Sequence, residues 1–147
     1  VAKGAGPAPP HGERVIVRPY DANPRAVARA LASADIFVHA GTMETFGLAP
    51  LEALACGTPV VVPACGGFLD LIDGRSAIGV DDATADALSE AVRSLDLSDR
   101  AVLSAAAVEV ARPYDEHRTF SRLFAHYAAL REGQARVGVN MGGLRAG

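Results

Sequence analysis

Two glutamates, Glu44 and Glu52, bracket a short apolar segment within the stretch GTMETFGLAPLEALACGTPVVV, residues 41–62. A carboxylate can accept hydrogen bonds from two vicinal hydroxyl groups, so each glutamate could bind hydroxyls of a sugar, with a ribose suiting Glu52. Gly47 lies where a helix is expected to begin, and because it has no Cβ a phosphate or sugar could approach the backbone closely. These residue types and their spacing indicate a site for a sugar joined to a phosphate.

The backbone around Gly47 is the second part of this candidate site. We expect a strand at 35–40, then a loop, then a helix from about 47 to 55. Phe46, Gly47 and Leu48 would then present free N–H groups, and the helix dipole would add positive potential. In open α/β sheets, ligands bind outside the carboxyl ends of the strands, where this loop would lie.

The environment of the two carboxylates leaves alternatives open. Glu52 is four residues after Leu48 and shares its helix face with Leu51 and Ala55. A charged carboxylate among apolar residues is costly unless it finds hydrogen-bond donors, which ribose hydroxyls would supply. The other interpretation is that Glu44 is a capping acid at the helix N-terminus and that Glu52 is a solvated surface residue.

A few further residues could lie near the site. Arg18 and Tyr20 end a predicted strand at 14–18, where they could flank a base or form a structural turn. His39 ends the strand before the loop, where it could contact the ligand or make a local hydrogen bond. Cys56 and Cys65 have neither CxxC nor zinc-site spacing, so we interpret them as small buried residues in a reducing compartment.

The elements that would position these residues alternate along the chain. Strands are expected at 14–18, 35–40, 59–63 and 77–80, and helices at 24–34, 47–55, 81–95, 98–110 and 116–132. Asn23 is the expected N-cap of the first helix, with Pro24 at its first position, and Gly57 is expected to end the second helix. Strands that are apolar throughout are typical of a parallel sheet covered on both faces. The sequence therefore predicts an α/β fold, a Rossmann-like parallel sheet with flanking helices. About four strands are fewer than a doubly wound domain has, and the chain begins with Val1, so we expect a piece of a longer protein.

The bulk composition excludes several classes. The chain has 147 residues, is 50% hydrophobic and has a formal net charge of −3, which is ordinary for one globular domain. There is no basic excess that would predict a nucleic-acid partner. No apolar run approaches the roughly 20 residues that span a bilayer, and no signal peptide is recognised. We expect a cytoplasmic location, an ordered region over 1–132 and a disordered tail over 133–147.

The stretch from Glu44 to Val62 resembles a segment of the family 4 retaining glycosyltransferases, in which two acids are separated by seven residues. Glu44 and Glu52 match the two acids, and Phe46 and Gly47 match the Phe-Gly of the motif. The sequence GAGP at 4–7 resembles the family's G-x-G-P turn, although its glycines alone would fit either a dinucleotide phosphate loop or a plain strand-to-loop turn. The resemblance covers residues 1–130.

The resemblance implies the GT-B architecture, in which two Rossmann-like domains face each other across a cleft. This chain would be an incomplete C-terminal domain, 1–132, which binds the nucleotide-sugar donor, and its partner would be the N-terminal acceptor domain of the same protein. By this resemblance Glu52 would bind the ribose hydroxyls. The donor sugar and the diphosphate would be bound by Glu44, Thr45, Phe46, Gly47 and Leu48. Transfer would retain anomeric configuration and need no metal or other cofactor. A UDP- or GDP-sugar is the expected donor, with peripheral membrane attachment if the acceptor is a lipid.

The sequence departs from the family pattern in a few places. Thr45 replaces a common Gly, Gly41 stands where Ser is common, and Asp70 stands where Glu usually follows Gly-Gly. The family's Arg and Lys that neutralise the leaving diphosphate lie upstream of the matched segment. We therefore expect no catalytic residue in this piece and no transfer by the piece alone.

Two other functions compete with the transferase hypothesis. The chain could be a non-catalytic module that binds a nucleotide or a nucleotide-sugar. It could also belong to another GT-B-like enzyme, such as a sugar epimerase or a phosphorylase. Glycogen-type phosphorylases need a lysine for pyridoxal phosphate, and the sequence after Lys3 contains none.

The last predicted helix carries an apolar stripe at helical spacing. Its members are Phe120, Leu123, Phe124, Tyr127 and Leu130. The spacing predicts core packing. The family resemblance instead implies that this helix packs towards the other domain, which would leave part of the stripe bare and favour association.

Overall fold

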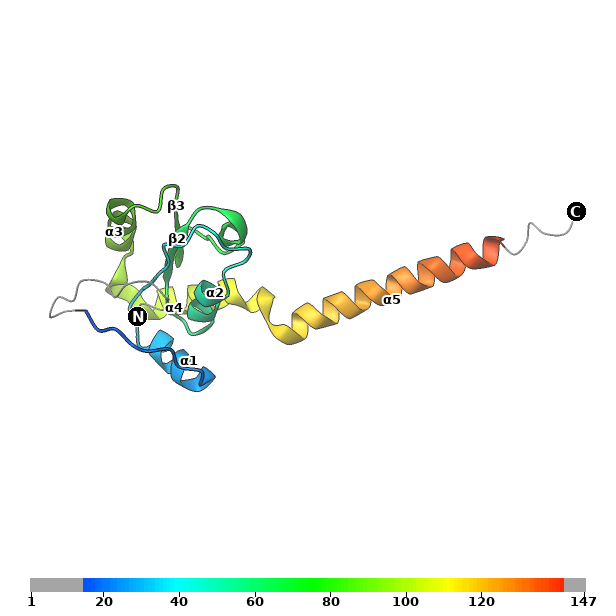
Figure 1. Cartoon of the computed structure of the whole chain (residues 1–147), viewed down its shortest axis with the longest axis horizontal. Helices are drawn as coiled ribbons and strands as arrows, with labels where there is room; N and C mark the ends of the chain where they lie inside the picture. Colours follow the sequence, from blue (N-terminus) through cyan, green and yellow to red (C-terminus); the bar gives the residue numbers. More distant parts are fainter. Residues whose placement is uncertain (1–14, 142–147) are drawn as a thin grey trace, which may run out of the picture.

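The chain folds around a small sheet with helices before, between and after its strands (Figure 1). The computed structural model describes residues 15–141, with side chains described as far as Glu132. In chain order the elements are α1 (Pro24–Ala32), β1 (Phe37–Val38), α2 (Leu48–Ala55), β2 (Val60–Pro63), the 3₁₀ turn η1 (Gly66–Asp70), β3 (Ala77–Val80), α3 (Ala85–Ser94), η2 (Leu97–Asp99), α4 (Arg100–Ala111), η3 (Arg112–Tyr114) and α5 (Glu116–Met141).

The sheet is parallel, with the strand order β1-β2-β3. Phe37 is opposite Val60 in the first pair, and Val60 is opposite Ala77 in the second. All four residues of β2 are buried, because this central strand is covered on both faces. Val60 and Val62 pack into one apolar cluster, whereas Val61 packs into another. The predicted α/β class with a covered parallel sheet is therefore confirmed.

Different helices cover the two faces. The larger cluster joins β2 to α2, α4 and η1 and includes Leu54, Phe68 and Ala107. The smaller cluster places Val61 and Val80 against residues of α3, with Leu95 just beyond its end. The larger cluster lies beneath the predicted site, since α2 and η1 both belong to it.

Capping residues set the boundaries of the helices, and those of α1 and α2 were predicted. The Asn23 side chain accepts a hydrogen bond from the Arg25 N–H, which fixes the start of α1. Helix α3 begins at Ala85, later than predicted, because the Thr84 side chain caps it by accepting from the Ala87 N–H. Gly57 closes α2 with a φ of 78°, as expected of a C-terminal glycine.

The predicted strand at 14–18 is wrong for the residues that the structure describes. Val15, Ile16 and Val17 lie in neither a helix nor a strand, and Ile16 is 75% exposed. A β-branched run forms a strand only where it finds a ladder partner, and the described sheet contains only β1, β2 and β3. The GAGP turn at 4–7 lies outside the described residues.

Helix α5 differs from its prediction in length and in packing. It continues to Met141, past the predicted end at residue 132, and it extends away from the body of the domain (Figure 1). The predicted core packing of its apolar stripe is wrong, because these side chains are 40–64% exposed: Phe120, Leu123, Phe124, Tyr127 and Leu130. The stripe has helical spacing but no element of the described chain beside it. Residues 133–141 belong to this helix, and the expected disorder of the 133–147 tail stays a prediction.

A hydrogen-bonded turn before β3 depends on Asp73. Its Oδ1 atom accepts from the backbone N–H groups of Arg75, Ser76 and Ala77 at 2.8–2.9 Å, and its Oδ2 atom accepts from the Ser76 hydroxyl at 2.8 Å. Partial burial raises the pKa of Asp73, but the hydrogen bonds from Ala77, Arg75 and Ser76 outweigh it, so the pKa is lowered overall. The carboxylate form is therefore the one that stabilises the turn.

We predict that Asp73→Ala lowers the free energy of unfolding by about 1–3 kcal/mol, because the fully buried Ser76 hydroxyl loses its partner. Because the folded pKa is lowered, this contribution is present above the unfolded value of about 3.9 and is lost as the pH falls through the folded value. Urea unfolding at pH 7 and at about pH 3 measures both effects, with exposed Asp82→Ala as control. Equal losses for Asp73→Ala and Asp82→Ala at pH 7 would contradict this role.

Candidate functional site

The site forms where two loops meet at the carboxyl end of the sheet. The loop at 39–47 follows β1, and the loop that begins at Ala64 follows β2. A Cβ on Gly66 would lie 2.9 Å from the Glu44 carbonyl oxygen, and one on Gly67 would lie 2.5 Å from the Thr45 carbonyl oxygen. The two backbones can approach so closely only because both residues are glycine.

Gly47 begins α2 in a left-handed conformation, with a φ of 85°. The position that its Cβ would occupy is filled by the ring of Phe68, which is fully buried. The sequence-based explanation, that the missing Cβ gives a phosphate room to approach, is therefore wrong for this side of the residue. Gly47 is needed for its backbone conformation and for its contact with Phe68.

The N-terminus of α2 has free backbone donors. Gly47 makes no side-chain capping bond, and Pro50 has no N–H to contribute. Because the first N–H groups of a helix lack intrahelical partners, Leu48 and Ala49 present theirs at the loop junction. No side-chain hydrogen bond joins Glu44 to the start of α2 among the described residues, so the structure does not support the alternative in which Glu44 caps the helix.

Glu44 and His39 lie beside each other in the first loop. The His39 N–H donates to the Val61 carbonyl at 2.9 Å, which extends the pairing of β1 with β2. Its ring packs at a tilt on Phe68, with 5.2 Å between centroids. The His39 Nε2 atom is 4.0 Å from Oε1 of Glu44, whose side chain is 42% exposed. The structure thus brings together two predicted site residues.

Phe46 contributes its backbone to the site, whereas its side chain anchors the loop. The ring meets that of Tyr114 edge-on, with centroids 5.2 Å apart. The Tyr114 hydroxyl in turn donates to the Asp70 carbonyl at 3.1 Å. These contacts connect both loops to η3, so α4 and the two loops form one packed unit. Thr45 and Leu48 are exposed, and Leu48 is 66% exposed.

Glu52 lies on the wall of a groove of about 530 Å³ between α2 and the C-terminal helices. Its neighbours on α2, Leu48, Leu51 and Ala55, line the same groove, which confirms the predicted shared face. Glu52 is exposed, so the argument that its charge is buried among apolar residues is wrong: the groove is open, and water reaches the carboxylate. The structure leaves the carboxylate available to a ligand in the groove.

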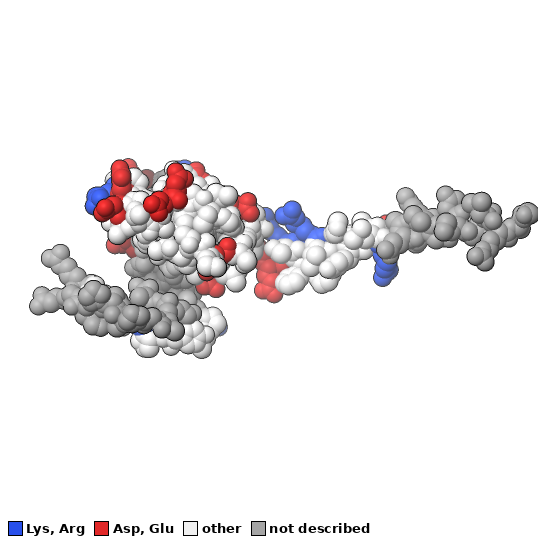
Figure 2. All heavy atoms as spheres, turned by 45° about the horizontal axis from the view of Figure 1, so that its top comes forward, with Lys and Arg blue, Asp and Glu red and all other residues white. Residues whose placement is uncertain are grey.

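The opposite wall of the groove comes from α4, η3 and the start of α5. It includes Val108, Arg112, Asp115 and Arg118. Arg112 forms an ion pair with Glu109 at 2.6 Å. Figure 2 shows basic side chains gathered where α5 leaves the body, with acidic ones beside them, and further acidic ones on the part of the body away from α5.

The two thiols have different environments. Partial burial, followed by the negative charge of Glu52, raises the pKa of the Cys56 thiol, so it stays protonated at neutral pH. The Cys65 thiol donates to the Thr42 carbonyl at 3.6 Å and helps to hold the two loops together. Both cysteines are free, and they are partly buried where the sequence predicted buried residues.

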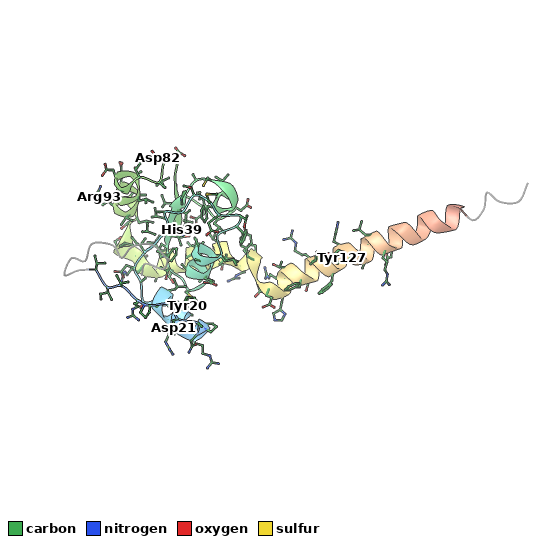
Figure 3. All side chains as sticks on the ribbon, viewed as in Figure 1. Tyr20, Asp21, His39, Asp82, Arg93 and Tyr127 are labelled. Atoms are coloured by element: carbon green, nitrogen blue, oxygen red, sulfur yellow. The ribbon has the colours of Figure 1, made fainter. Side chains whose placement is uncertain are left out.

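Arg18 and Tyr20 lie in the extended segment before α1. Both are exposed, and Figure 3 shows Tyr20 beside α1 and separated from His39 at the end of β1. The structure therefore does not place Tyr20 with the loops that carry Glu44. A role for either residue near a base stays a prediction.

Sequence reasoning missed the residues that hold the loops in place. Phe68 supports both Gly47 and His39, and Tyr114 supports Phe46. The adjacent glycines Gly66 and Gly67 were the available signal, because a Gly-Gly pair can mark a close backbone contact. Within residues 15–132, no cluster of three or more His, Cys, Asp or Glu residues is arranged to bind a metal.

Comparison with known proteins identifies the family. The profile described as glycosyl transferases group 1 matches residues 11–109, which include both loops, α2 and the whole sheet. This chain belongs to the glycosyl transferases group 1 family. Both glutamates and helix α2 thus lie inside the matched region.

Three relatives are similar to parts of the chain. A GDP-mannose-dependent alpha-(1-6)-phosphatidylinositol dimannoside mannosyltransferase of Mycobacterium tuberculosis is 46% identical over 70 residues, which are 48% of this chain and 18% of that protein. A D-inositol 3-phosphate glycosyltransferase of Geodermatophilus obscurus is 38% identical over 110 residues, 74% of this chain and 24% of that protein. A D-inositol 3-phosphate glycosyltransferase 1 of Catenulispora acidiphila is 34% identical over 125 residues, 83% of this chain and 30% of that protein.

This group 1 chain therefore spans less than a third of the length of each of these relatives. Among the helices that the structure describes, none combines the length and the apolar character needed to cross a membrane.

We predict that Gly47→Ala destabilises the fold more than Gly74→Ala does. Both glycines have a positive φ, of 85° and 70°, so an added Cβ strains both backbones by about 1–2 kcal/mol. Only at Gly47 does the Cβ also meet Phe68, which adds about 1–3 kcal/mol of overpacking, whereas Gly74 has nothing within 4 Å. Denaturant unfolding measures the loss in free energy of unfolding for each variant. Equal losses would show that the packing of Phe68 does not require the absence of a Cβ at Gly47.

Proposed function

We infer that this chain is the nucleotide-sugar-binding part of a retaining glycosyltransferase. The observation that carries this proposal is the uncapped N-terminus of α2 at the carboxyl end of the sheet, with Glu44 before it and Glu52 on its exposed face. The free N–H groups of Leu48 and Ala49, together with the helix dipole, form a site suited to a diphosphate. The two carboxylates are hydrogen-bond acceptors suited to sugar hydroxyls on either side of it.

Each group has one role in the proposal. Glu52 accepts from the ribose hydroxyls, and Glu44 accepts from hydroxyls of the donor sugar. The backbone of Thr45, Phe46 and Gly47, which the contacts with Gly66 and Gly67 hold in place, borders the diphosphate. Transfer keeps the anomeric configuration and uses no metal.

The donor is a GDP- or UDP-sugar. One relative is described as GDP-mannose-dependent, which supports GDP as the first nucleotide to test. The relatives named for D-inositol 3-phosphate support a polyol or polyol phosphate acceptor, which would bind to a second domain of the same protein. We further propose that the protein works in the cytoplasm, at the membrane surface if its acceptor is a lipid.

We predict that Glu52→Ala weakens GDP binding by about tenfold or more, because hydrogen bonds to a carboxylate contribute about 1.5–3 kcal/mol each. The same loss should follow when the ligand is 2′,3′-dideoxy-GDP and the protein is unchanged. Combining the variant with the dideoxy ligand should cause no additional loss, because both changes remove the same interaction. Titration calorimetry of the 147-residue chain measures all four affinities.

Glu90→Ala is the matched control, since Glu90 is an exposed glutamate on α3, away from the groove. It should leave the affinity for GDP unchanged. The ribose assignment is wrong if Glu52→Ala binds GDP like the parent chain, or if the dideoxy ligand weakens the variant as much as it weakens the parent. Binding of UDP but not GDP would change the nucleotide and leave the roles of the glutamates in place.

We predict that the isolated chain binds the donor but forms no transfer product. Developing negative charge on a leaving diphosphate needs cationic groups in place, and the matched motif itself supplies only backbone amides and acids. Incubation of the chain with GDP-mannose and inositol phosphate, followed by mass spectrometry, measures transfer and hydrolysis. Transfer product formed by the chain alone would contradict the prediction, and an epimerised nucleotide-sugar would favour the epimerase alternative.

A further inference from the structure

His39 has a buried ring nitrogen without a hydrogen-bond partner. Its Nε2 atom is shielded from solvent, and it is the sole such side-chain atom found among the described residues that are not exposed. An unsatisfied buried polar group is destabilising, so native structures rarely keep one without a reason. The nearest acceptor given by the structure is Oε1 of Glu44, at 4.0 Å.

The neighbouring residues restrict the position of His39, whereas the side chain of Glu44 is less restricted. The His39 N–H is bound to the Val61 carbonyl, and the ring packs on Phe68, which is fully buried. A Cβ on Gly41 would lie 2.8 Å from Nε2, so the bare glycine leaves room at this atom. The Glu44 side chain, by contrast, is 42% exposed and makes no other ion pair in the described part of the chain.

A small movement therefore joins the two groups. An N–H···O hydrogen bond has a length of about 2.9 Å, so a shift of roughly 1 Å by Glu44 would complete the bond. The bond would occupy one carboxylate oxygen and fix the χ angles of Glu44. The second oxygen would then be held in one position at the mouth of the loop.

We propose that His39 is a positioning residue for Glu44, and that the Nε2–H···Oε1 bond orients the other carboxylate oxygen towards a hydroxyl of the donor sugar. The proposal rests on the proposed function of the two loops. It assigns His39 no contact with the ligand, and it separates recognition of the sugar from recognition of the nucleotide. Loss of the bond therefore affects binding of a nucleotide-sugar and leaves binding of the nucleoside diphosphate intact.

Two variants of His39 test the hydrogen bond. His39→Phe keeps a ring against Phe68 but removes Nε2, whereas His39→Gln places an amide N–H near the same position. Titration calorimetry with GDP and GDP-mannose should show about a tenfold loss for His39→Phe with GDP-mannose only. His39→Gln should recover most of this loss, and thermal unfolding reports whether each variant still folds.

A double-variant cycle tests whether His39 acts through Glu44. In a Glu44→Ala background, His39→Phe should cause no further loss of GDP-mannose affinity. The proposal is overturned if the loss persists in that background, if His39→Gln fails to recover binding, or if His39→Phe weakens GDP and GDP-mannose equally. The last result would show that His39 only supports the fold of the loops.

An NMR measurement without ligand tests the His39–Glu44 hydrogen bond separately from the proposed function. Two-bond ¹H–¹⁵N spectra of the imidazole rings report protonation at Nε2, and the His39 signals are assigned as those missing in His39→Gln. We expect a protonated Nε2 whose resonance moves in Glu44→Ala and stays in place in Glu90→Ala. An unmoved resonance overturns the proposal, whereas a moved resonance without binding of any nucleotide overturns the proposed function alone.

Discussion

The site depends on the close contact between the loops after β1 and β2. Gly66 and Gly67 let the second loop approach the backbone of Glu44, Thr45 and Phe46. The side chain that follows these glycines, Phe68, then fills the space beside Gly47 and packs on His39. One buried aromatic ring thus sets both the start of α2 and the place of the histidine beside Glu44. The free amides of α2 are held in position because the core beneath them is tightly packed.

The sequence was sufficient for the elements whose signals are local. Asn23 with Pro24 predicted the start of α1, and the apolar run at 59–63 predicted a strand covered on both faces. Those signals depend on backbone conformation and on periodicity, which a single segment contains. The predicted helix after β1 is likewise present, with Glu44 before it and Glu52 in it, and the family match covers this segment.

The remaining features depend on contacts between distant segments. Val15–Val17 has the composition of a strand but has no neighbour to pair with in the described sheet, and the apolar stripe of α5 has no element to pack on. The sequence left open whether Glu52 lies among apolar side chains or at the solvated surface, and the structure exposes it on the wall of a groove. The packing of Phe68 against Gly47 could not be predicted from the sequence. An aromatic residue after Gly-Gly does not indicate which distant glycine its ring will contact.

The central proposal is that the start of α2 binds the diphosphate of a nucleotide. Backbone amide chemical-shift mapping of the ¹⁵N-labelled chain with added GDP, and in parallel UDP, tests this directly. We expect the largest shifts at Leu48 and Ala49, with smaller ones through the loop at 41–47 and at Glu52. Shifts that concentrate on α5 or α3, or a spectrum that neither nucleotide changes, would contradict it.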